Sequence, residues 1–308
     1  LDKSIFDIIE SQSKHTQSLL KEIHTNINFN NKDIEIDRSI DLATIENSLS
    51  KVLILSGTGG VGKTALIKKY YEKVDDSVPF YMFKATEFEL SNLNELFKEC
   101  KFQDFIDYYQ DQKNKVIVVD SAENLLGLKN SEPFKEFLVL LTENNWRLIF
   151  TTRDNYLENL NYEFFEIYHI APQNMHISNL NSEELTSFSE VNSFSLPKDE
   201  KLIDLIRNPF YLKEYLNHYK NSQKLDYAEF KEKLWNKLIK KTKPSREQCF
   251  LQIVLARAQN GQFFVKSNFN QEILDNELVK DGILGYESPY GYFITHDIYE
   301  EWALEKTI

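Results

Sequence analysis

The sequence predicts an α/β fold in which helices flank a parallel β-sheet, followed by a small helical domain and a domain of helices with a β-hairpin. Two observations support the first part. Short apolar runs alternate with helical patterns in the first half of the chain, and this alternation is typical of a parallel sheet covered by helices. Four of the nine glycines lie between Gly57 and Gly62, so the backbone follows an unusual path there.

The composition excludes several classes of protein. The chain has 308 residues and a net charge of −12 at pH 7, so we expect two or three packed units and do not expect nucleic acid as a partner. Cys100 and Cys249 are too few for a disulfide framework or a thiolate metal cluster. No apolar run approaches the roughly 18 residues that cross a membrane. We therefore expect a cytoplasmic protein without membrane contacts.

The elements follow in order along the chain. Residues 1–25 have the spacing of an amphipathic helix, and we treat residues 1–30 as an N-terminal helical linker. The apolar run Val52–Leu55 leads to the glycines, and a helical pattern follows at Ala65–Tyr70. Further strands are predicted at Phe80–Phe83, Val116–Val119, Leu148–Phe150 and His176–Leu180. Together these elements predict one sheet domain over residues 31–180.

The second half has a different pattern. Residues 181–243 contain amphipathic stretches without a convincing strand, and Asn181 is spaced from Glu184 as a helix-capping pair. This pattern predicts a small helical domain. Residues 244–308 combine helical patterns at 247–259 and 271–284 with an apolar run at 292–294, which predicts a winged helix.

The two ends of the chain indicate a fragment. The first residue is Leu1 rather than Met, and the last residues up to Ile308 continue a helical pattern without a cap. We expect a longer protein with further domains.

The glycine cluster gives the most specific prediction of a binding site. Residues 57–64 match the P-loop pattern GxxxxGK[ST] in full, between a strand and a helix. Backbone N–H groups and the helix N-terminus then bind phosphates, while Lys63 contacts the β- and γ-phosphates and Thr64 binds Mg²⁺. A chance glycine-rich turn is the alternative. We predict a site for ATP or ADP with Mg²⁺ formed by Gly57, Thr58, Gly59, Gly60, Val61, Gly62, Lys63, Thr64 and Ala65.

Three more residues complete a hydrolytic site. Asp120 ends an apolar strand and is the expected second Mg²⁺ ligand, unless it caps the next helix. Glu123 is the candidate that orients the attacking water, unless it is a solvated residue of a first helical turn. Arg153 ends another apolar strand and suits the γ-phosphate, unless it forms a surface ion pair with Asp154 or a neighbouring glutamate. We predict an ATPase in which Lys63, Asp120, Glu123 and Arg153 are catalytic.

Taken together, the motifs resemble the STAND class of P-loop NTPases over roughly residues 34–308. Phe150–Arg153 looks like the sensor 1 strand of that class, Asn208–Leu212 its proline motif, and Tyr292–Asp297 its His-Asp motif. The resemblance implies that Pro209 meets adenine and that His296 contacts the β-phosphate of ADP. A plain helix-breaking proline and a helix-capping histidine are the alternatives.

The segment before the P-loop adds a smaller similarity. Ile36-Asp37-Arg38 resembles the segment that lines the adenine pocket in this class, which implies that Arg38 binds nucleotide. Ser121 departs from the family, because several branches carry a second acidic residue at that position. Because of this departure, the catalytic carboxylate must be Glu123 or come from elsewhere, and we expect slow turnover.

Residues 296–303 look closest to prokaryotic antiviral members of the AVAST type. The resemblance implies a molecular switch that ADP holds closed and that opens for ATP-dependent homo-oligomerisation. It also implies fused effector and sensor domains outside this chain and an unknown trigger such as a viral protein.

Two other functions remain open. An AAA+-like ATPase of the origin-recognition or loader kind would bind DNA through its winged helix. Acidic side chains in the last third of the chain oppose this function: Glu272, Asp275, Glu277, Asp281 and Glu287. A metabolic kinase would use the same P-loop, but no segment resembles an acceptor-binding lid.

Overall fold

The computed structural model describes residues 5–97, 100–217, 219, 225–260, 264–288, 290–295 and 297–307. The chain divides into two compact units. The first unit comprises Leu1–Ile27 and Glu35–Ser178, and the second comprises Asn28–Ile34 and Asn179–Ile308. The predicted limits of the linker, sheet, helical and winged-helix domains stay predictions.

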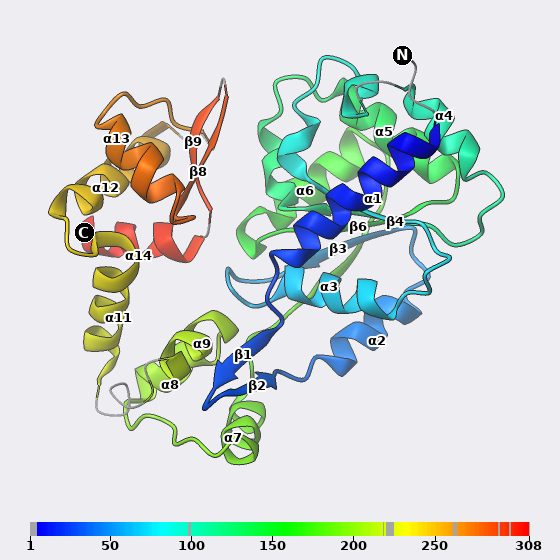
Figure 1. The fold of residues 1–308 in the computed structure, drawn as a ribbon. Coiled ribbons are helices and arrows are strands. Elements are labelled where there is room, and N and C mark those ends of the chain that lie inside the picture. The colour runs from blue at the N-terminus through cyan, green and yellow to red at the C-terminus, as the bar shows by residue number, and fades with distance from the viewer. Residues whose placement is uncertain are drawn as a thin grey trace. The chain divides into compact units, whose positions relative to one another are not determined.

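A parallel five-stranded sheet forms the centre of the first unit, with the order β4-β5-β6-β3-β7. Its strands are β3 (Val52–Ser56), β4 (Phe80–Lys84), β5 (Val116–Asp120), β6 (Arg147–Thr151) and β7 (Gln173–His176). Strands β3, β4 and β6 are labelled in Figure 1. Every residue of β3 is buried, as expected for a parallel strand with helices on both faces. Strand β6 lies between β3 and β5, so the carboxyl ends of these three strands are neighbours.

The helices of the first unit surround this sheet. They are α1 (Ile5–Lys21), α2 (Ser39–Asn47), α3 (Lys63–Lys73), α4 (Phe102–Tyr108), α5 (Glu132–Glu143) and α6 (Asp154–Glu166), with short 3-10 helices η1 (Ala85–Phe88), η2 (Leu93–Leu96) and η3 (Ala122–Gly127). One hydrophobic cluster joins the sheet to α2 and α3, and an aromatic-rich cluster joins it to α4, α5 and α6. Helix α1 packs along the edge strand β4, where Met82 N–H donates to Thr16 Oγ1 (3.0 Å). The amphipathic helix predicted at the N-terminus is confirmed for the residues that the structure describes.

The bounds of the last predicted strand are wrong. The strand is Gln173–His176 rather than His176–Leu180. It is an edge strand in which Met175 alone is buried, so its sequence carries no apolar run. Ile177 still donates its N–H to Ser56 O (2.8 Å), and the chain leaves the sheet after this bond.

A β-hairpin that was not predicted occupies an Asn-rich stretch at the boundary between the predicted linker and the predicted sheet domain. It consists of β1 (Asn26–Phe29) and β2 (Lys32–Glu35). Asn30 and Asn31 form its turn with φ angles of 51° and 60°, and asparagine tolerates this left-handed region in two-residue hairpin turns. Phe29 packs edge-on against Phe194 and Tyr219 of the second unit. The tip of the hairpin therefore belongs to the second unit.

The second unit is mostly helical. Its elements are α7 (Ser182–Val191), α8 (Glu200–Ile206), α9 (Pro209–Asn217), α11 (Tyr227–Trp235), α12 (Pro244–Asn260), α13 (Gln271–Ile273) and α14 (Asp297–Thr307), the π-helical turns η4 (Asn236–Lys240) and η5 (Leu274–Val279), and the antiparallel strands β8 (Leu284–Glu287) and β9 (Gly291–Ile294). The predicted capping pair is confirmed, because Asn181 Oδ1 accepts from Glu184 N (2.9 Å) and Glu184 Oε2 accepts from Asn181 N (2.7 Å).

The helix predicted at 271–284 is too long. The helical turns end at Val279, and Gly282 then adopts a φ of 69°, which is typical of a glycine that terminates a helix. The chain continues into β8, which pairs with β9. The predicted hairpin strand at 292–294 is confirmed within β9. None of the helices in the described part of the chain has both the length and the apolar character that a membrane span needs.

Candidate nucleotide-binding site

The glycine-rich loop follows β3 directly and leads into α3. Gly60 and Gly62 have φ angles of 77° and 101°, a region that glycine adopts at little cost. A Cβ atom at Gly57 would lie 2.6 Å from the carbonyl oxygen of Ile177, so the close approach of the chain after β7 excludes a side chain there. The loop ends at the N-terminus of an 11-residue helix, whose free N–H groups and dipole favour phosphate.

Lys63 is the first residue of α3 and lies against the loop. Its Nζ donates to Gly57 O (2.7 Å) and Thr58 O (3.1 Å). Burial lowers the pKa of Lys63, while the charges of Glu123, Asp120 and Asp154 oppose this shift. Three carboxylates from other elements therefore act on this ammonium group.

Asp120 is the centre of a hydrogen-bonded group at the carboxyl end of the sheet. Its Oδ1 accepts from Thr64 Oγ1 on α3 (3.1 Å) and from Thr151 Oγ1 at the end of β6 (2.5 Å). Thr151 reaches Asp120 because β6 is the neighbour of β5. Thr64 reaches it from α3, which begins where the P-loop ends.

The Thr64 and Asp120 oxygens fit a shared Mg²⁺. They lie 3.1 Å apart, and adjacent oxygen ligands of an octahedral Mg²⁺ are about 2.9 Å apart. No group of three or more His, Cys, Asp or Glu side chains among the described residues is arranged to hold a metal ion. Proteins usually hold Mg²⁺ at nucleotides through one or two protein oxygens together with phosphates and water.

Glu123 is turned into the protein by an unusual backbone at Ser121. Ser121 has a left-handed conformation (φ 58°, ψ 49°), which costs about 1–2 kcal/mol for a residue with a side chain, and its N–H donates to Thr151 Oγ1 (3.0 Å). Glu123 follows on η3 and is 8% exposed. The alternative of a solvated glutamate is therefore wrong.

The Glu123 carboxylate is held at both oxygens by residues that follow β6. Thr152 Oγ1 donates to Glu123 Oε2 (3.1 Å), and Arg153 Nε lies 3.0 Å from Glu123 Oε1. Burial raises the pKa of Glu123, and the charge of Arg153 opposes the rise. The ion pair considered for Arg153 exists, but its partner is the buried Glu123, and the Arg153 side chain is only 14% exposed.

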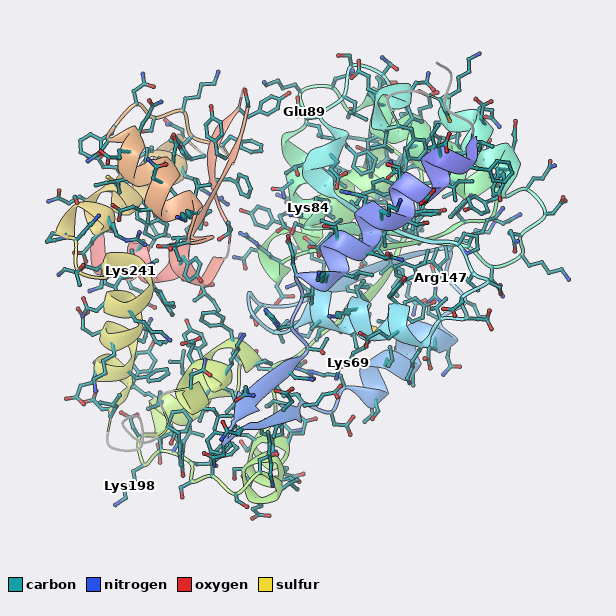
Figure 2. The ribbon with its side chains drawn as sticks, in the orientation of Figure 1. Lys69, Lys84, Glu89, Arg147, Lys198 and Lys241 are labelled. Carbon is teal, nitrogen blue, oxygen red and sulfur yellow. The ribbon has the colours of Figure 1, made fainter. Side chains whose placement is uncertain are left out.

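Arg38 lies beside the P-loop. Its Nη2 donates to Ser178 O (2.9 Å) and Val61 O (3.4 Å), and its Nη1 pairs with Asp41 (3.3 Å). Lys69 of α3, labelled in Figure 2, holds the same segment by donating to Ile36 O (3.1 Å). The segment before the P-loop is thus anchored to the loop, as a wall of a nucleotide site would need to be.

The structure does not test two of the predicted residues. Pro209 is the first residue of α9 in the second unit, a position that suits proline in any helix, and its contact with adenine stays a prediction. His296 lies outside the described residues, and its role also stays a prediction.

Several residues of the site were missed in the sequence. Thr151 and Thr152 supply the hydroxyls that hold Asp120 and Glu123, and the only signal was two hydroxyl residues at the end of an apolar strand. His176 ends β7, where its Nδ1 lies 3.1 Å from Asp154 Oδ1 and 3.4 Å from Ser56 Oγ. The predicted strand at 176–180 has His176 as its first residue, whereas His176 is the last residue of β7, so the prediction placed it at the wrong end of the strand.

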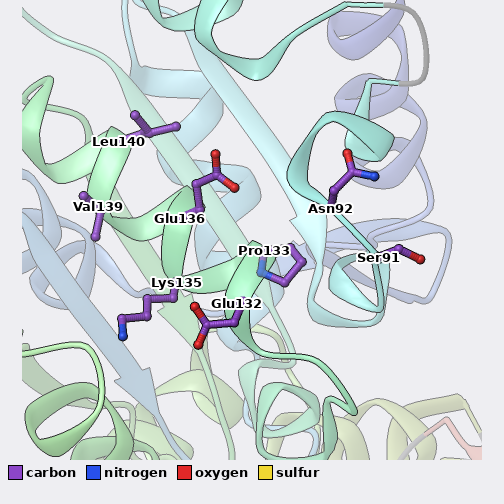
Figure 3. Close-up of a pocket in the computed structure, with 8 residues that line it drawn as sticks. All are labelled: Ser91, Asn92, Glu132, Pro133, Lys135, Glu136, Val139 and Leu140. Atoms are coloured by element: carbon purple, nitrogen blue, oxygen red, sulfur yellow. The ribbon is translucent and has the colours of Figure 1, made fainter.

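A separate pocket lies on the first unit beside α5 (Figure 3). It is lined by Ser91, Asn92, Glu132, Pro133, Lys135, Glu136, Val139 and Leu140. None of these is a predicted site residue, so this pocket is distinct from the P-loop.

One family model matches the part of the chain that contains the site. Residues 53–165 match the model of the family described as "ATPase family associated with various cellular activities (AAA)". This segment runs from β3 to α6 and contains the P-loop, Asp120, Glu123 and Arg153. The matched family is the one named in the AAA+-like alternative, and the match does not show the STAND class. No curated protein matches the sequence.

The solved structures to which this chain is similar are distant from it in sequence. A Walker-type ATPase of Pyrococcus abyssi is 16% identical with a TM-score of 0.48, covering 92% of this chain and 99% of that one. The ORC1 protein of Aeropyrum pernix in complex with DNA is 12% identical with a TM-score of 0.44, covering 89% and 94%. AMPPCP-bound DnaA from Aquifex aeolicus is 17% identical with a TM-score of 0.43, covering 77% and 73%. The family match, with the P-loop and Asp120 inside the matched segment, identifies this protein as an ATPase.

Proposed function

We propose that the chain is the switch core of a STAND-type ATPase, which ADP holds closed and which exchanges ADP for ATP when activated. The observation that carries this proposal is the position of Arg153. It follows β6, the strand next to the P-loop strand, and its guanidinium pairs with the glutamate that we assign to hydrolysis. A guanidinium at this edge suits a γ-phosphate, because its fork can donate two parallel hydrogen bonds.

The chemistry follows from the groups around Asp120. The P-loop N–H groups and Lys63 would bind the β- and γ-phosphates, and Thr64 and Asp120 would hold Mg²⁺, which neutralises phosphate charge when bound. Glu123 would orient a water molecule for attack on the γ-phosphorus and accept its proton as the bond to ADP breaks. Burial raises the pKa of Glu123, which makes its carboxylate a stronger base.

The switch itself needs the second unit. The resemblance assigns nucleotide contacts to Pro209 and His296, and only contacts that differ between closed and open states shift an equilibrium. Arg38 would line the part of the site that contacts adenine. Fused effector and sensor domains, activation by a viral protein, homo-oligomerisation and a role in prokaryotic antiviral defence rest on the resemblance alone.

The charges of the second unit oppose the DNA-binding alternative. Arg246 is 2% exposed and pairs with Glu277 (3.2 Å) and Asp281 (2.7 Å). Lys243 pairs with Glu277 (2.6 Å) and Lys241 with Asp281 (2.5 Å). These three cations are therefore neutralised within the unit, whereas a DNA-binding surface needs cations available to phosphates.

ADP retention tests the proposal. We expect purified wild-type protein to keep ADP through gel filtration, Lys63→Ala to lose it, and the matched control Lys73→Ala on the same helix to keep it. For His296→Ala we expect faster release of a fluorescent ADP in stopped flow and self-association, with the exposed His24→Ala as control. Unchanged release from His296→Ala would refute the ADP lock, and nanomolar, salt-sensitive binding of duplex DNA would favour the alternative.

A further inference from the structure

We infer that Glu123 determines the selectivity of this site for ATP over ADP, because it competes with the γ-phosphate for Arg153. The inference rests on the proposed function, in which Arg153 reads the γ-phosphate. It goes further by giving Glu123 a role in nucleotide binding, in addition to its role in hydrolysis.

The geometry makes the Arg153–Glu123 pair a defined unit. Arg153 Nε and Glu123 Oε1 lie 3.0 Å apart, with 14% and 6% of their side chains exposed. The second carboxylate oxygen accepts from Thr152 Oγ1 (3.1 Å). Both oxygens of Glu123 are therefore engaged by two consecutive residues, and Arg153 occupies the side of Oε1 while this arrangement lasts.

The competition follows from charge. A γ-phosphate that takes hydrogen bonds from Arg153 draws the guanidinium away from a buried carboxylate and brings a second anion close to it. Like charges repel strongly where water is excluded. ADP has no γ-phosphate and leaves the pair intact. Glu123 should therefore weaken ATP binding and leave ADP binding almost unchanged.

The same exchange links recognition to hydrolysis. When Arg153 turns to the γ-phosphate, Glu123 keeps the Thr152 hydroxyl at Oε2 and loses its cationic partner at Oε1, so Oε1 can accept from water. Binding of ATP thus frees Glu123 from Arg153, so that Glu123 can act as the general base. With ADP bound, Glu123 remains paired.

A double-mutant cycle with two nucleotides tests the inference. Calorimetry with Mg²⁺ would measure the affinities of wild type, Glu123→Gln, Arg153→Ala and the double variant for ADP and for AMPPCP, which carries a γ-phosphate but resists hydrolysis. Glutamine keeps the size of the side chain and removes its charge. We expect Glu123→Gln to bind AMPPCP roughly tenfold more tightly, as for loss of an opposing charge-assisted hydrogen bond, with ADP affinity within about twofold of wild type.

The tighter binding of AMPPCP by Glu123→Gln should depend on Arg153. In the Arg153→Ala background, Glu123→Gln should not tighten AMPPCP. Arg153→Gln, which removes the charge and keeps much of the length of the side chain, serves as a second background should Arg153→Ala fail to fold. The exposed Glu143→Gln is the matched control and should change neither affinity.

The outcomes separate the two proposals. If Glu123→Gln tightens ADP and AMPPCP equally, or tightens AMPPCP without Arg153, the competition is refuted. If Arg153→Ala selectively loses AMPPCP while Glu123→Gln has no effect, Arg153 is a sensor and only the competition fails. If Arg153→Ala binds both nucleotides as wild type does, the proposed γ-phosphate contact itself fails.

Discussion

Replacing Arg153 by alanine should destabilise the first unit in a pH-dependent way. The substitution leaves the Glu123 carboxylate, with 6% of its side chain exposed, without its cationic partner. Breaking a buried ion pair by removing one partner typically costs about 3–5 kcal/mol. Two features lower this figure here: the Thr152 hydroxyl still donates to Glu123, and Arg153 itself retains some contact with solvent. We expect a loss of about 2–3 kcal/mol at pH 8.

The sign of the pH dependence follows from the pKa of Glu123. Burial already raises this pKa in the wild type, and Arg153 limits the rise, so the variant should have a still higher value. A carboxyl group with a raised folded-state pKa favours folding below its ordinary pKa, and this stability is lost as the pH rises through the raised value. The variant should therefore be less destabilised at pH 5.5 than at pH 8.

Thermal unfolding followed by circular dichroism measures the effect. For a unit of 150–250 residues, 1 kcal/mol shifts the Tm by about 2–4 °C, so the expected decrease at pH 8 is roughly 5–10 °C. Glu123→Gln/Arg153→Ala should recover most of the loss, because no charge stays buried. Lys73→Ala, which breaks an exposed pair with Glu46 (3.6 Å), should change the Tm little. An unchanged Tm in Arg153→Ala, or a double variant that is equally unstable, would refute the reasoning.

Four further outcomes are expected. Gly57→Ala places a methyl group 2.6 Å from a backbone oxygen; it should abolish ADP binding in calorimetry and lower the Tm, and normal binding would contradict the close approach. Asn181→Ala removes a helix cap and should cost about 1 kcal/mol in urea unfolding, whereas Ser182→Ala should cost less. The acidic limb of the pH–kcat profile should lie above the ordinary glutamate range, because the pKa of Glu123 is raised; a limb near pH 4 would count against Glu123 as the base. Removal of Mg²⁺ with EDTA should stop hydrolysis, and Asp120→Asn should hydrolyse ATP more slowly and require a higher Mg²⁺ concentration; hydrolysis in EDTA would exclude the assigned role of Asp120 and Thr64.

Local interactions account for what could be predicted correctly from the sequence. The P-loop appears because phosphate binding needs glycines at fixed spacing before a helix, and the φ angles of Gly60 and Gly62 agree with that need. The central strands appear because full burial makes them continuously apolar. The capping pair of Asn181 and Glu184 could be predicted because the two residues are only three positions apart.

Other features escaped prediction because they depend on long-range packing. The edge strand β7 has one buried residue, so its pairing with β3 leaves no periodic pattern. The hairpin at Asn30 and Asn31 carries a recognisable turn, but its packing against Phe194 depends on residues more than 160 positions away.

The sequence by itself determined the nucleotide-binding motif, the α/β pattern and the identity of the charged residues around it. Only the tertiary structure decided that β6 lies between β3 and β5, which brings Thr151 to Asp120 and both Thr152 and Arg153 to Glu123. Strand order is set by how whole faces of the sheet bury their apolar side chains, and no local pattern encodes it. The ion pair between Arg153 and Glu123 is a consequence of that strand order.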